Sequence, residues 1–536
     1  MQSITLNLGS PNLTGLHRAG MAGLWMTLQQ LGKDISKGDR PGQLDWQLSS
    51  RQILLDWQGN DFEVLDWLLK QSFQTSPEGF ISLRGLNSDT LPPEQKWVLH
   101  QGMLRTFLQH TSTHKSDGKV SIVFTIDEVE FPLSYKSIKS YAHQDFAKNL
   151  CDKHGNLLNK AIGVAGWLNP GAVVRHTAFS SSTSFEENPT DALLLLFAPV
   201  ACYYFLLRSK LRDKRAQYAL VVPEVVDLEA FARIRQHREW RKSGYKDFCA
   251  TGLGDAGLQF LTHESVAHTA QQYQVKSCQV ITFGSVAWSS QQMTRTELHL
   301  IEASDRACEN YQILRQIPFF KNRVRPGDKG GFITVSFARE LITENLAHSH
   351  EWYQGFSTKV NSRELFQKLT YDREGLYQMV QKSKWDTESK QLFVQACHQA
   401  IGNTYGKAAG RADDSNTAPD FDRINVKIRS KLGRCKNAAS FRAFITYFWS
   451  RAGKVSLVQD NWRELMELIT GEENWKLGRD LFLLALASYK GSKKKSSDLE
   501  EEEEEEEEME EDNMTGSEGY ETDEEIDEEE GFNYEE

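Results

Sequence analysis

Short runs of alternating apolar and polar residues dominate the first part of the chain. They include residues 4–8 (ITLNL) and 120–124 (VSIVF), and a period of two is typical of half-buried β-strands. Between these runs, apolar residues recur at helical spacing over residues 25–31 and 62–69. Residues 1–160 are therefore expected to form an α+β N-terminal domain.

The mixed pattern continues beyond this first domain. Strand-like runs follow at residues 218–222, 279–283 and 332–337, with helical patterns between them up to about residue 345. Residues 161–361 are therefore expected to continue the mixed α/β fold. We find no internal repeat.

From about Ser362 the apolar residues recur at helical spacing only. The repeating positions are Leu365, Leu369, Leu376 and Val380; Phe393, Cys397 and Ile401; Phe441, Phe444, Ile445 and Phe448; Trp462, Leu465, Leu468 and Ile469; and residues 481–486. Residues 362–491 are expected to form a C-terminal bundle of four or five helices. The polar stretch 411–420 should connect its second and third helices. The fold class is therefore α+β, a mixed body followed by a helical bundle.

One stretch is apolar without interruption. Residues 192–207 (ALLLLFAPVACYYFLL) carry no charge and lie between Asp191 and Arg208. They are fewer than the roughly 20 residues that a membrane-spanning helix needs, and they include Pro199. We expect a buried core helix here; a peripheral membrane protein that uses this segment is the alternative.

Cysteine usage and the first residues bear on the compartment. The seven cysteines are isolated, with no CxxC pair, which favours neither a zinc site nor a disulfide framework. The start of the chain shows no basic segment followed by an apolar one, so nothing in it predicts secretion. A cytoplasmic protein is expected.

Charge is distributed unevenly along the chain. Residues 498–536 hold 24 of the 74 acidic residues and no Lys or Arg, so the rest of the chain has 50 acidic residues against 62 basic ones, a formal charge of +12. A basic body of this size favours polyanionic partners such as DNA or RNA. Residues 492–536 include nine consecutive glutamates and are expected to be a disordered acidic tail. The tail could act as an intramolecular DNA mimic, recruit a basic partner, or keep a basic protein in solution.

The basic residues of the body gather in five clusters. These are Arg208, Lys210, Arg212, Lys214 and Arg215; Arg233, Arg235, Arg238, Arg241 and Lys242; Lys321, Arg323, Arg325 and Lys329; Arg423, Lys427, Arg429, Lys431, Arg434, Lys436 and Arg442; and Arg451 with Lys454. Any one of them would fit a solvated surface. The presence of all five clusters on a basic body indicates that they neutralise nucleic-acid phosphates. Binding of this kind depends steeply on the salt concentration.

Signals for catalysis are weak. Residues 252–257 match GxGxxG, but they follow no clear strand and lack the acidic residue expected about 20 positions later. The pairs His110 and His114, and His348 and His350, lack a neighbouring Glu in a metal-site arrangement. The chain is therefore expected to act by binding and not to catalyse a reaction. We expect no metal and no cofactor. A nucleic-acid-processing enzyme with an unrecognised active site is the alternative.

Four stretches together resemble a known family. They are residues 16–24 (LHRAGMAGL), 166–176 (GWLNPGAVVRH), 195–199 (LLFAP) and 218–224 (YALVVPE). They are similar to the large subunit of type I CRISPR Cascade complexes, and most of all to the MYXAN-type branch grouped with type I-B. Gly20 and Gly23 in the first stretch would also permit close helix packing, and residues 169–171 (NPG) are a turn signal.

The resemblance implies a function and a set of partners. A subunit of this family works without catalysis in a complex with CRISPR guide RNA and other Cascade subunits. Its N-terminal domain probes the protospacer-adjacent motif in double-stranded target DNA, and its helical C-terminal part guides the displaced strand of the R-loop. A separate helicase-nuclease is recruited for cutting, or transposition proteins take its place. This division of labour agrees with RNA-guided recognition in general.

The resemblance also directs attention to two positions. A loop that probes a DNA motif should combine glycine with side chains that can enter a groove, and residues 82–88 (SLRGLNS) are our candidate. Within it Arg84 can pair with guanine edges and Asn87 with adenine edges. Members of type I-B commonly supply a small subunit by internal translation, and a product that starts at Met379 would hold most of the helical bundle.

Overall fold

The structure is a computed structural model that describes residues 2–164, 166–170, 185–209, 217–263, 266, 277–288, 291–327, 330–414, 418–472 and 474–491. The chain separates into two units, Met1–Ser488 and Tyr489–Glu536. All elements below belong to the first unit. The acidic tail predicted for residues 492–536 lies outside the described residues.

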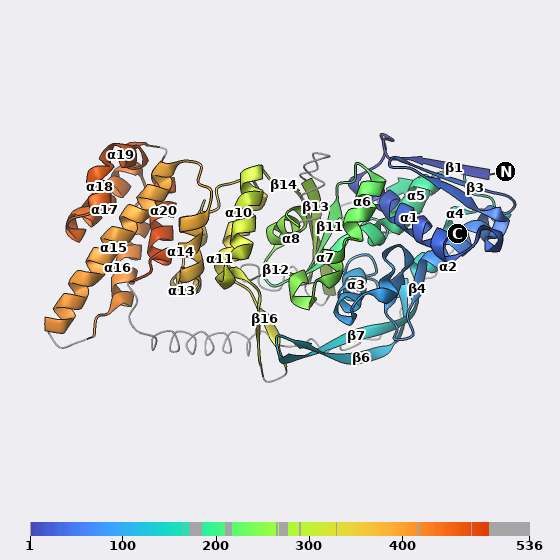
Figure 1. The fold of residues 1–536 in the computed structure, drawn as a ribbon, viewed down its shortest axis with the longest axis horizontal. Coiled ribbons are helices and arrows are strands. Elements are labelled where there is room, and N and C mark those ends of the chain that lie inside the picture. Colours follow the sequence, from blue (N-terminus) through green and yellow to red (C-terminus); the bar gives the residue numbers. More distant parts are fainter. Residues whose placement is uncertain are drawn as a thin grey trace. The chain divides into compact units, whose positions relative to one another are not determined.

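A small antiparallel sheet opens the fold (Figure 1). Its strands are β1 (Gln2–Asn7), β3 (Gln52–Trp57) and β2 (Asp45–Leu48), in the order β1-β3-β2. Ile53, Leu55 and Trp57 alternate towards the core, as the period of two predicts. Helix α1 (Gly15–Asp34) lies between β1 and β2 in the chain and α2 (Asp61–Ser72) follows β3; the side chains of Thr14 and Asn60 cap them.

Helix α1 packs unusually closely against α5 (Pro189–Ala201). A Cβ atom on Gly20 would lie 1.9 Å from the carbonyl oxygen of Leu194, and one on Gly23 would lie 2.1 Å from that of Phe197. Only glycine fits at these two positions. The expected packing role of the two glycines is therefore confirmed.

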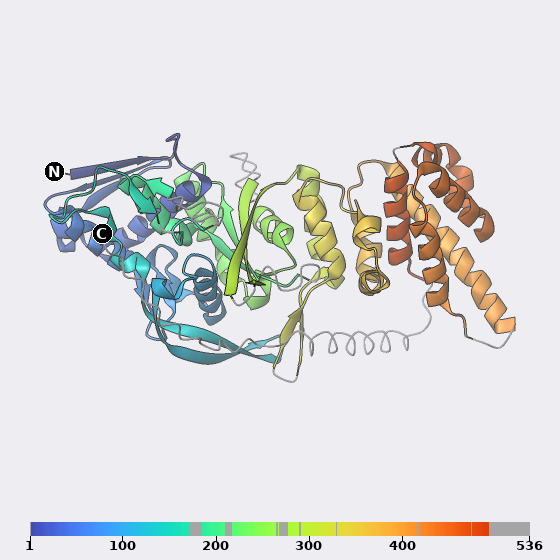
Figure 2. The same ribbon diagram turned by 180° about the vertical axis from the view of Figure 1, so that it is seen from behind.

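A five-stranded sheet forms the centre of the body, in the order β12-β10-β11-β13-β14. Its strands are β10 (Tyr203–Leu207), β11 (Tyr218–Pro223), β12 (Cys249–Ala250), β13 (Ser277–Trp288) and β14 (Gln291–Glu302). All neighbours are antiparallel except β10 and β12. Helix α3 (Pro93–Arg105) contacts β10, and α8 (Leu253–Leu261) contacts β11 and β13; Figure 2 shows the sheet from the side of β14.

The sequence pattern predicted one buried helix over residues 192–207. The structure shows a helix followed by a strand instead. Helix α5 ends at Ala201, and β10 takes the remaining residues into the sheet. Pro199 cannot donate the backbone hydrogen bond that a helix needs, and the following Tyr203, Tyr204 and Phe205 favour a strand. Both halves are buried, and no helix in the described part of the chain has the length and apolar character that crossing a membrane requires.

A long hairpin of β6 (His114–Ile126) and β7 (Val129–Tyr141) runs from the N-terminal region to a second two-stranded sheet, β15 (Arg323–Arg325) with β16 (Phe332–Thr334) (Figure 1). Asp127 and Glu128 have positive φ at its turn, as a tight hairpin requires. Near the tip, the backbone N–H of Gly331 donates to the carbonyl of Glu130 over 2.7 Å. The hairpin thus joins two regions that are far apart in sequence.

Shorter elements complete the body. The strands are β4 (Phe73–Thr75) paired with β5 (Ile81–Leu83), and β8 (Ile162–Val164) paired with β9 (Phe185–Glu187). The helices are α4 (Ala147–Leu150), α6 (Leu228–Arg235), α7 (Arg238–Lys242), α10 (Asp305–Gln316), α11 (Phe337–Ala347) and α12 (Phe356–Lys359). The strand predicted over residues 332–337 ends earlier, because Ser336 caps α11.

The GxGxxG glycines serve packing in this fold. Gly252 precedes α8 as its N-cap, and Gly254 and Gly257 lie in α8, where a Cβ on Gly254 would be 2.8 Å from the carbonyl oxygen of Thr343 on α11. A Cβ on Gly257 would be 2.5 Å from Ile301 Cδ1 on β14. The glycines therefore let α8 approach α11 and the sheet.

The C-terminal helices are more numerous than the four or five expected. The described residues contain α13 (Arg363–Tyr371), α14 (Arg373–Lys382), α15 (Glu388–Asp414), α16 (Phe421–Gly433), α17 (Ala438–Ala452), α18 (Ser456–Asp460), α19 (Trp462–Thr470) and α20 (Trp475–Ser488). Helix α20 contacts α13 to α17 and α19, and its residues 480–488 are all buried. Helix α15 covers residues 411–414 of the predicted connector.

Candidate nucleic-acid interface

The predicted motif-probing loop, residues 82–88, starts at the end of β5 and continues into two 3₁₀ turns, Arg84–Leu86 and Ser88–Thr90, so the loop proper is residues 84–90. Arg84 turns towards the protein: Nη1 lies 2.8 Å from Asp34 Oδ2, and Nε donates to the Gln71 carbonyl over 2.7 Å. Reading a base would require Arg84 to give up these contacts. Asn87 is exposed, with a left-handed φ of 48°, so it is the member of the pair that is presented to solvent.

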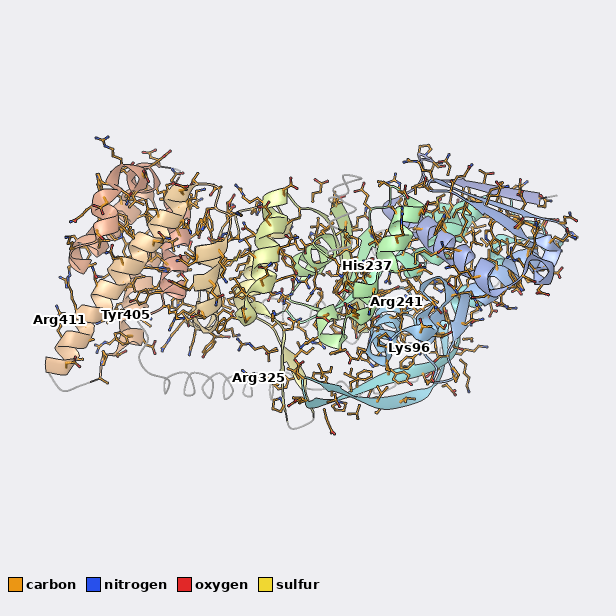
Figure 3. The ribbon with its side chains drawn as sticks, in the orientation of Figure 1. Lys96, His237, Arg241, Arg325, Tyr405 and Arg411 are labelled. Carbon is orange, nitrogen blue, oxygen red and sulfur yellow. The ribbon has the colours of Figure 1, made fainter. Side chains whose placement is uncertain are left out.

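The second basic cluster lies against this loop, which the sequence did not indicate. Arg241 on α7 donates to the Leu86 carbonyl over 2.7 Å and to Thr90 Oγ1 over 3.0 Å. Gln236 Nε2 donates to the Gly85 carbonyl over 3.3 Å. Figure 3 marks Arg241. These contacts fix the backbone of the loop.

The remaining members of that cluster divide into two groups. Arg235 stacks over the Tyr203 ring, with its Cζ atom 4.3 Å from the ring centre, and Lys242 pairs with Glu239 at 2.9 Å. Arg233 and Arg238 are exposed, and the structure gives their side chains no ion pair within its described part. Two of the five cations are thus available to an external anion without losing a contact.

A small pocket of about 50 Å³ lies between the loop, α3 and α7. Tyr203, Arg235 and Trp240 line it, and three of their atoms, Tyr203 Oη, Arg235 Nε and Trp240 Nε1, are buried without a hydrogen-bond partner in the described structure. Burial lowers the pKa of Arg235. A pocket with these three unpaired polar atoms can hold water molecules.

The first and third clusters are only partly described. Arg208 is exposed, with its Nη2 atom 3.3 Å from Tyr245 Oη. Lys210, Arg212, Lys214 and Arg215 lie outside the described residues, as do Arg175 and His176 at the end of the stretch 166–176 that carries the family resemblance. Lys321 is exposed, and Arg323 stacks over Phe319 at 5.8 Å. Residues 323–325 form β15 and not a loop, with Arg325 half-buried, and Lys329 is not described.

The fourth and fifth clusters meet on α16 and α17. On α16, Arg423, Lys427, Lys431 and Arg434 recur at intervals of three and four residues and are exposed, which places them on one side of the helix. On α17, the Tyr447 ring centre lies 5.2 Å from Lys431 Nζ and 5.8 Å from Arg451 Cζ. We call these six residues, Arg423, Lys427, Lys431, Arg434, Tyr447 and Arg451, the α16–α17 face.

Other cations flank this face or point elsewhere. Lys436, Arg442 and Lys454 are exposed, whereas Arg429 is half-buried over the Phe366 ring at 5.4 Å. Burial lowers the pKa of Arg429. Tyr405 on α15, marked in Figure 3, stacks on Phe421 with ring centres 4.7 Å apart. This contact fixes the start of α16.

The α16–α17 face lies in a segment with few counter-charges. Residues 421–455 hold nine Lys and Arg residues and one acidic residue, Asp422. None of the nine forms an ion pair with a carboxylate in the described residues, whereas Lys368 and Lys390 pair with acids one helical turn away. Such a surface creates a positive potential that attracts polyanions.

Sequence reasoning missed Tyr447, although the signal was present. The buried residues of α17 are Phe441, Ile445, Phe448, Trp449 and Ala452, and these follow the helical period. Tyr447 lies off that stripe and four residues before Arg451, on the same side of the helix. An aromatic residue off the apolar stripe next to a cation is the pattern that would have found it.

The histidine pairs have no metal-site geometry. Within the described ranges, no group of three or more His, Cys, Asp or Glu side chains is arranged to hold a metal ion. The rings of His348 and His350 stack with centres 6.1 Å apart at the protein surface. The seven cysteines are free thiols.

Known proteins with a similar sequence identify the family. The DevT N-terminal domain family matches residues 5–196, and the DevT C-terminal domain family matches residues 381–516. CRISPR-associated protein Cas8a1/Csx13 of Myxococcus xanthus is 27% identical over 521 residues, which cover 91% of this chain and 89% of that protein. The chain belongs to the large subunits of type I CRISPR effector complexes. The family predicted from the four sequence stretches is therefore confirmed, and the α16–α17 face of this large subunit lies inside the DevT C-terminal domain.

Proposed function

We propose that this large subunit binds nucleic acid within a guide-RNA complex and that the α16–α17 face is one of its contact surfaces. The observation that carries the proposal is the set of exposed cations without counter-ions on α16 and α17. Each cation that meets a phosphate releases a condensed counter-ion, which supplies much of the binding free energy of nucleic-acid complexes. In the assembled complex, this surface would contact the displaced strand of the R-loop.

The second part of the proposal concerns the protospacer-adjacent motif. The loop of residues 84–90 is held by Arg241 and Gln236, and Asn87 is its exposed polar side chain. An asparagine amide can pair with an adenine edge in the major groove. Arg233 and Arg238 would contact phosphates on either side, so that the loop meets the duplex in one register.

The other partners follow from the family. We propose that the subunit contacts the guide RNA and other Cascade subunits in the cytoplasm, and that it has no catalytic role of its own. A helicase-nuclease, or transposition proteins, would act on the DNA that the complex has opened. These partner assignments rest on the family resemblance. The predicted domain boundaries at residues 160, 361 and 491 are also proposals.

The internal start at Met379 remains a proposal and has a structural consequence. Met379 lies in α14 and is fully buried. A product from this residue would lack residues 355–357, whose backbone N–H groups at Gly355 and Ser357 donate to the Asp480 carboxylate over 2.7 and 2.8 Å. Asp480 would then need new partners, which another subunit could supply.

Co-purification tests the proposed function. The chain is expressed together with the products of its genomic neighbours, and the purified material is analysed for protein subunits and RNA. We expect a stable complex that contains a guide RNA. A chain that purifies alone and without RNA contradicts the proposal, and metal-dependent DNA cleavage by that isolated chain would favour the enzyme alternative.

A further inference from the structure

Tyr447 has an environment that the neutralisation of phosphates does not explain. Its side chain is 53% exposed on α17, although it is large and mostly apolar. Two cations from different helices, Lys431 and Arg451, approach the same ring. The ring does not contribute to the buried stripe of α17, so core packing gives no reason for an aromatic residue here.

The surrounding charges restrict what can cover this ring. A ring that an ammonium and a guanidinium group both approach lies in a positive field, so a cationic or purely apolar partner gains little there. A nucleobase joined to phosphates satisfies both features, because the base stacks on the ring while the phosphates meet the cations. The bases of a duplex are stacked on one another, and only unpaired bases present a free face.

We propose that Tyr447 is a stacking platform that gives the α16–α17 face a preference for unpaired nucleic acid. Lys431 and Arg451 hold the phosphates on either side of the stacked base, and Lys427 and Arg434 extend the track along α16. The ligand is a single-stranded polynucleotide, either DNA or RNA. This inference rests on the proposed nucleic-acid binding of the same face and adds the selection of strand state.

The preference has an expected size. Stacking of one base on an aromatic side chain contributes about 1–3 kcal/mol, and 1.4 kcal/mol is a factor of ten in affinity. Replacement of the ring should therefore weaken single-strand binding by about tenfold and leave duplex binding unchanged. Loss of the cations, by contrast, should weaken the binding of both.

Three variants of the full chain test the stacking role. Y447L removes the ring, Y447F keeps it, and W462L removes an equally prominent aromatic residue, which is 44% exposed on α19 and has no cation over its ring in the described structure. Binding is measured to an oligo-dT, an oligo-rU and a DNA duplex at one salt concentration. We expect about tenfold weaker single-strand binding for Y447L only, with Y447F and W462L like the parent chain. The two oligonucleotides decide between DNA and RNA as the ligand.

A fourth variant separates failure of this inference from failure of the proposed function. The double variant with K431Q and R451Q keeps the ring and removes the charges. If the double variant binds all three ligands more weakly while Y447L binds them like the parent chain, the face binds nucleic acid and the stacking role is wrong. If neither variant changes binding, the face is not the contact surface. Equal weakening of duplex and single-strand binding by Y447L also overturns the stacking role, and the melting temperature of each variant shows that it is folded.

Discussion

The guanidinium of Arg241 donates a 2.7 Å hydrogen bond to the backbone carbonyl of Leu86, a residue 155 positions earlier in the chain. A second bond from the same side chain reaches Thr90 Oγ1. The two bonds hold both 3₁₀ turns of the candidate motif-probing loop. We therefore regard Arg241 as a positioning residue for the loop and not as a direct phosphate contact.

The first prediction concerns the order of this loop. Hydrogen bonds from charged groups contribute about 1.5–3 kcal/mol each, so R241Q should let the loop open more often. We expect amide hydrogen exchange in residues 84–90 to accelerate by at least about tenfold. R238Q on the same helix is the matched control, because Arg238 is exposed and has no ion pair in the described structure. Equal exchange in the parent chain and in R241Q would show that the loop is held by other contacts.

A buried ion pair joins three helices of the body. Arg339 Nη2 on α11 lies 2.8 Å from Asp255 Oδ2 on α8, and the hydroxyl of Tyr311 on α10 donates to Asp255 Oδ1 over 2.6 Å. Burial alone would lower the pKa of Arg339, but the Asp255 carboxylate raises it above that of free arginine. The side chains of Arg339 and Asp255 are 5% and 0% exposed, so the pair is almost completely shielded from solvent.

Removal of one partner should therefore be costly. A buried pair that loses one charge leaves the other uncompensated, at a cost of about 3–5 kcal/mol. We expect D255N to lower the free energy of unfolding by this amount in urea denaturation. E239Q breaks the exposed pair between Glu239 and Lys242 and should leave the free energy of unfolding almost unchanged, because solvent screens this pair. Similar losses for both variants would contradict the structural role of Asp255.

His143 predicts a dependence of stability on pH. Its side chain is fully buried against Phe73 and Trp167, and neither ring nitrogen has a hydrogen-bond partner in the described structure. Burial lowers its pKa from 6.5 to about 3. Between these two values the unfolded chain binds a proton that the folded chain does not, so stability falls as the pH decreases below about 6.5.

The variant H143F isolates this contribution. Between about pH 7 and pH 5 the parent chain should lose about 2 kcal/mol through this residue, and His100, with a pKa lowered to about 4 by burial, should add to the loss. We expect the free energy of unfolding of H143F to decrease by about 2 kcal/mol less over the same range. Parallel pH profiles for the two proteins would show that His143 can be protonated in the fold.

Sequence periodicity predicted elements well where a pattern was long and regular. The α+β body, the C-terminal helices and the strands at residues 4–8 and 120–124 are confirmed. It was wrong at residues 192–207, because uniform apolarity cannot distinguish a buried helix from a buried strand. The predicted number of bundle helices was too low, because the basic α16 and the short α18 have narrow apolar stripes that the sequence pattern did not reveal.

The candidate site was harder to predict from sequence. Charge clustering marked the cations of the α16–α17 face, but it could not show that Lys431 and Arg451 share one ring. It also gave Arg84 and Arg241 the same role as exposed arginines. Their partners, Asp34 and Leu86, are 50 and 155 residues away, and only the tertiary fold brings them together.

The salt dependence of binding tests the central claim most directly. The triple variant with K427Q, K431Q and R434Q is compared with the parent chain and with a control triple variant, K115Q, K119Q and K136Q, on the exposed β6–β7 hairpin. For single-stranded DNA, the slope of log K against log salt changes by about 0.7 for each phosphate neutralised. We predict that the α16–α17 variant has a slope about 2 units shallower than the parent chain and that the hairpin control is unchanged. An unchanged slope for the α16–α17 variant would contradict the claim that this face binds nucleic acid.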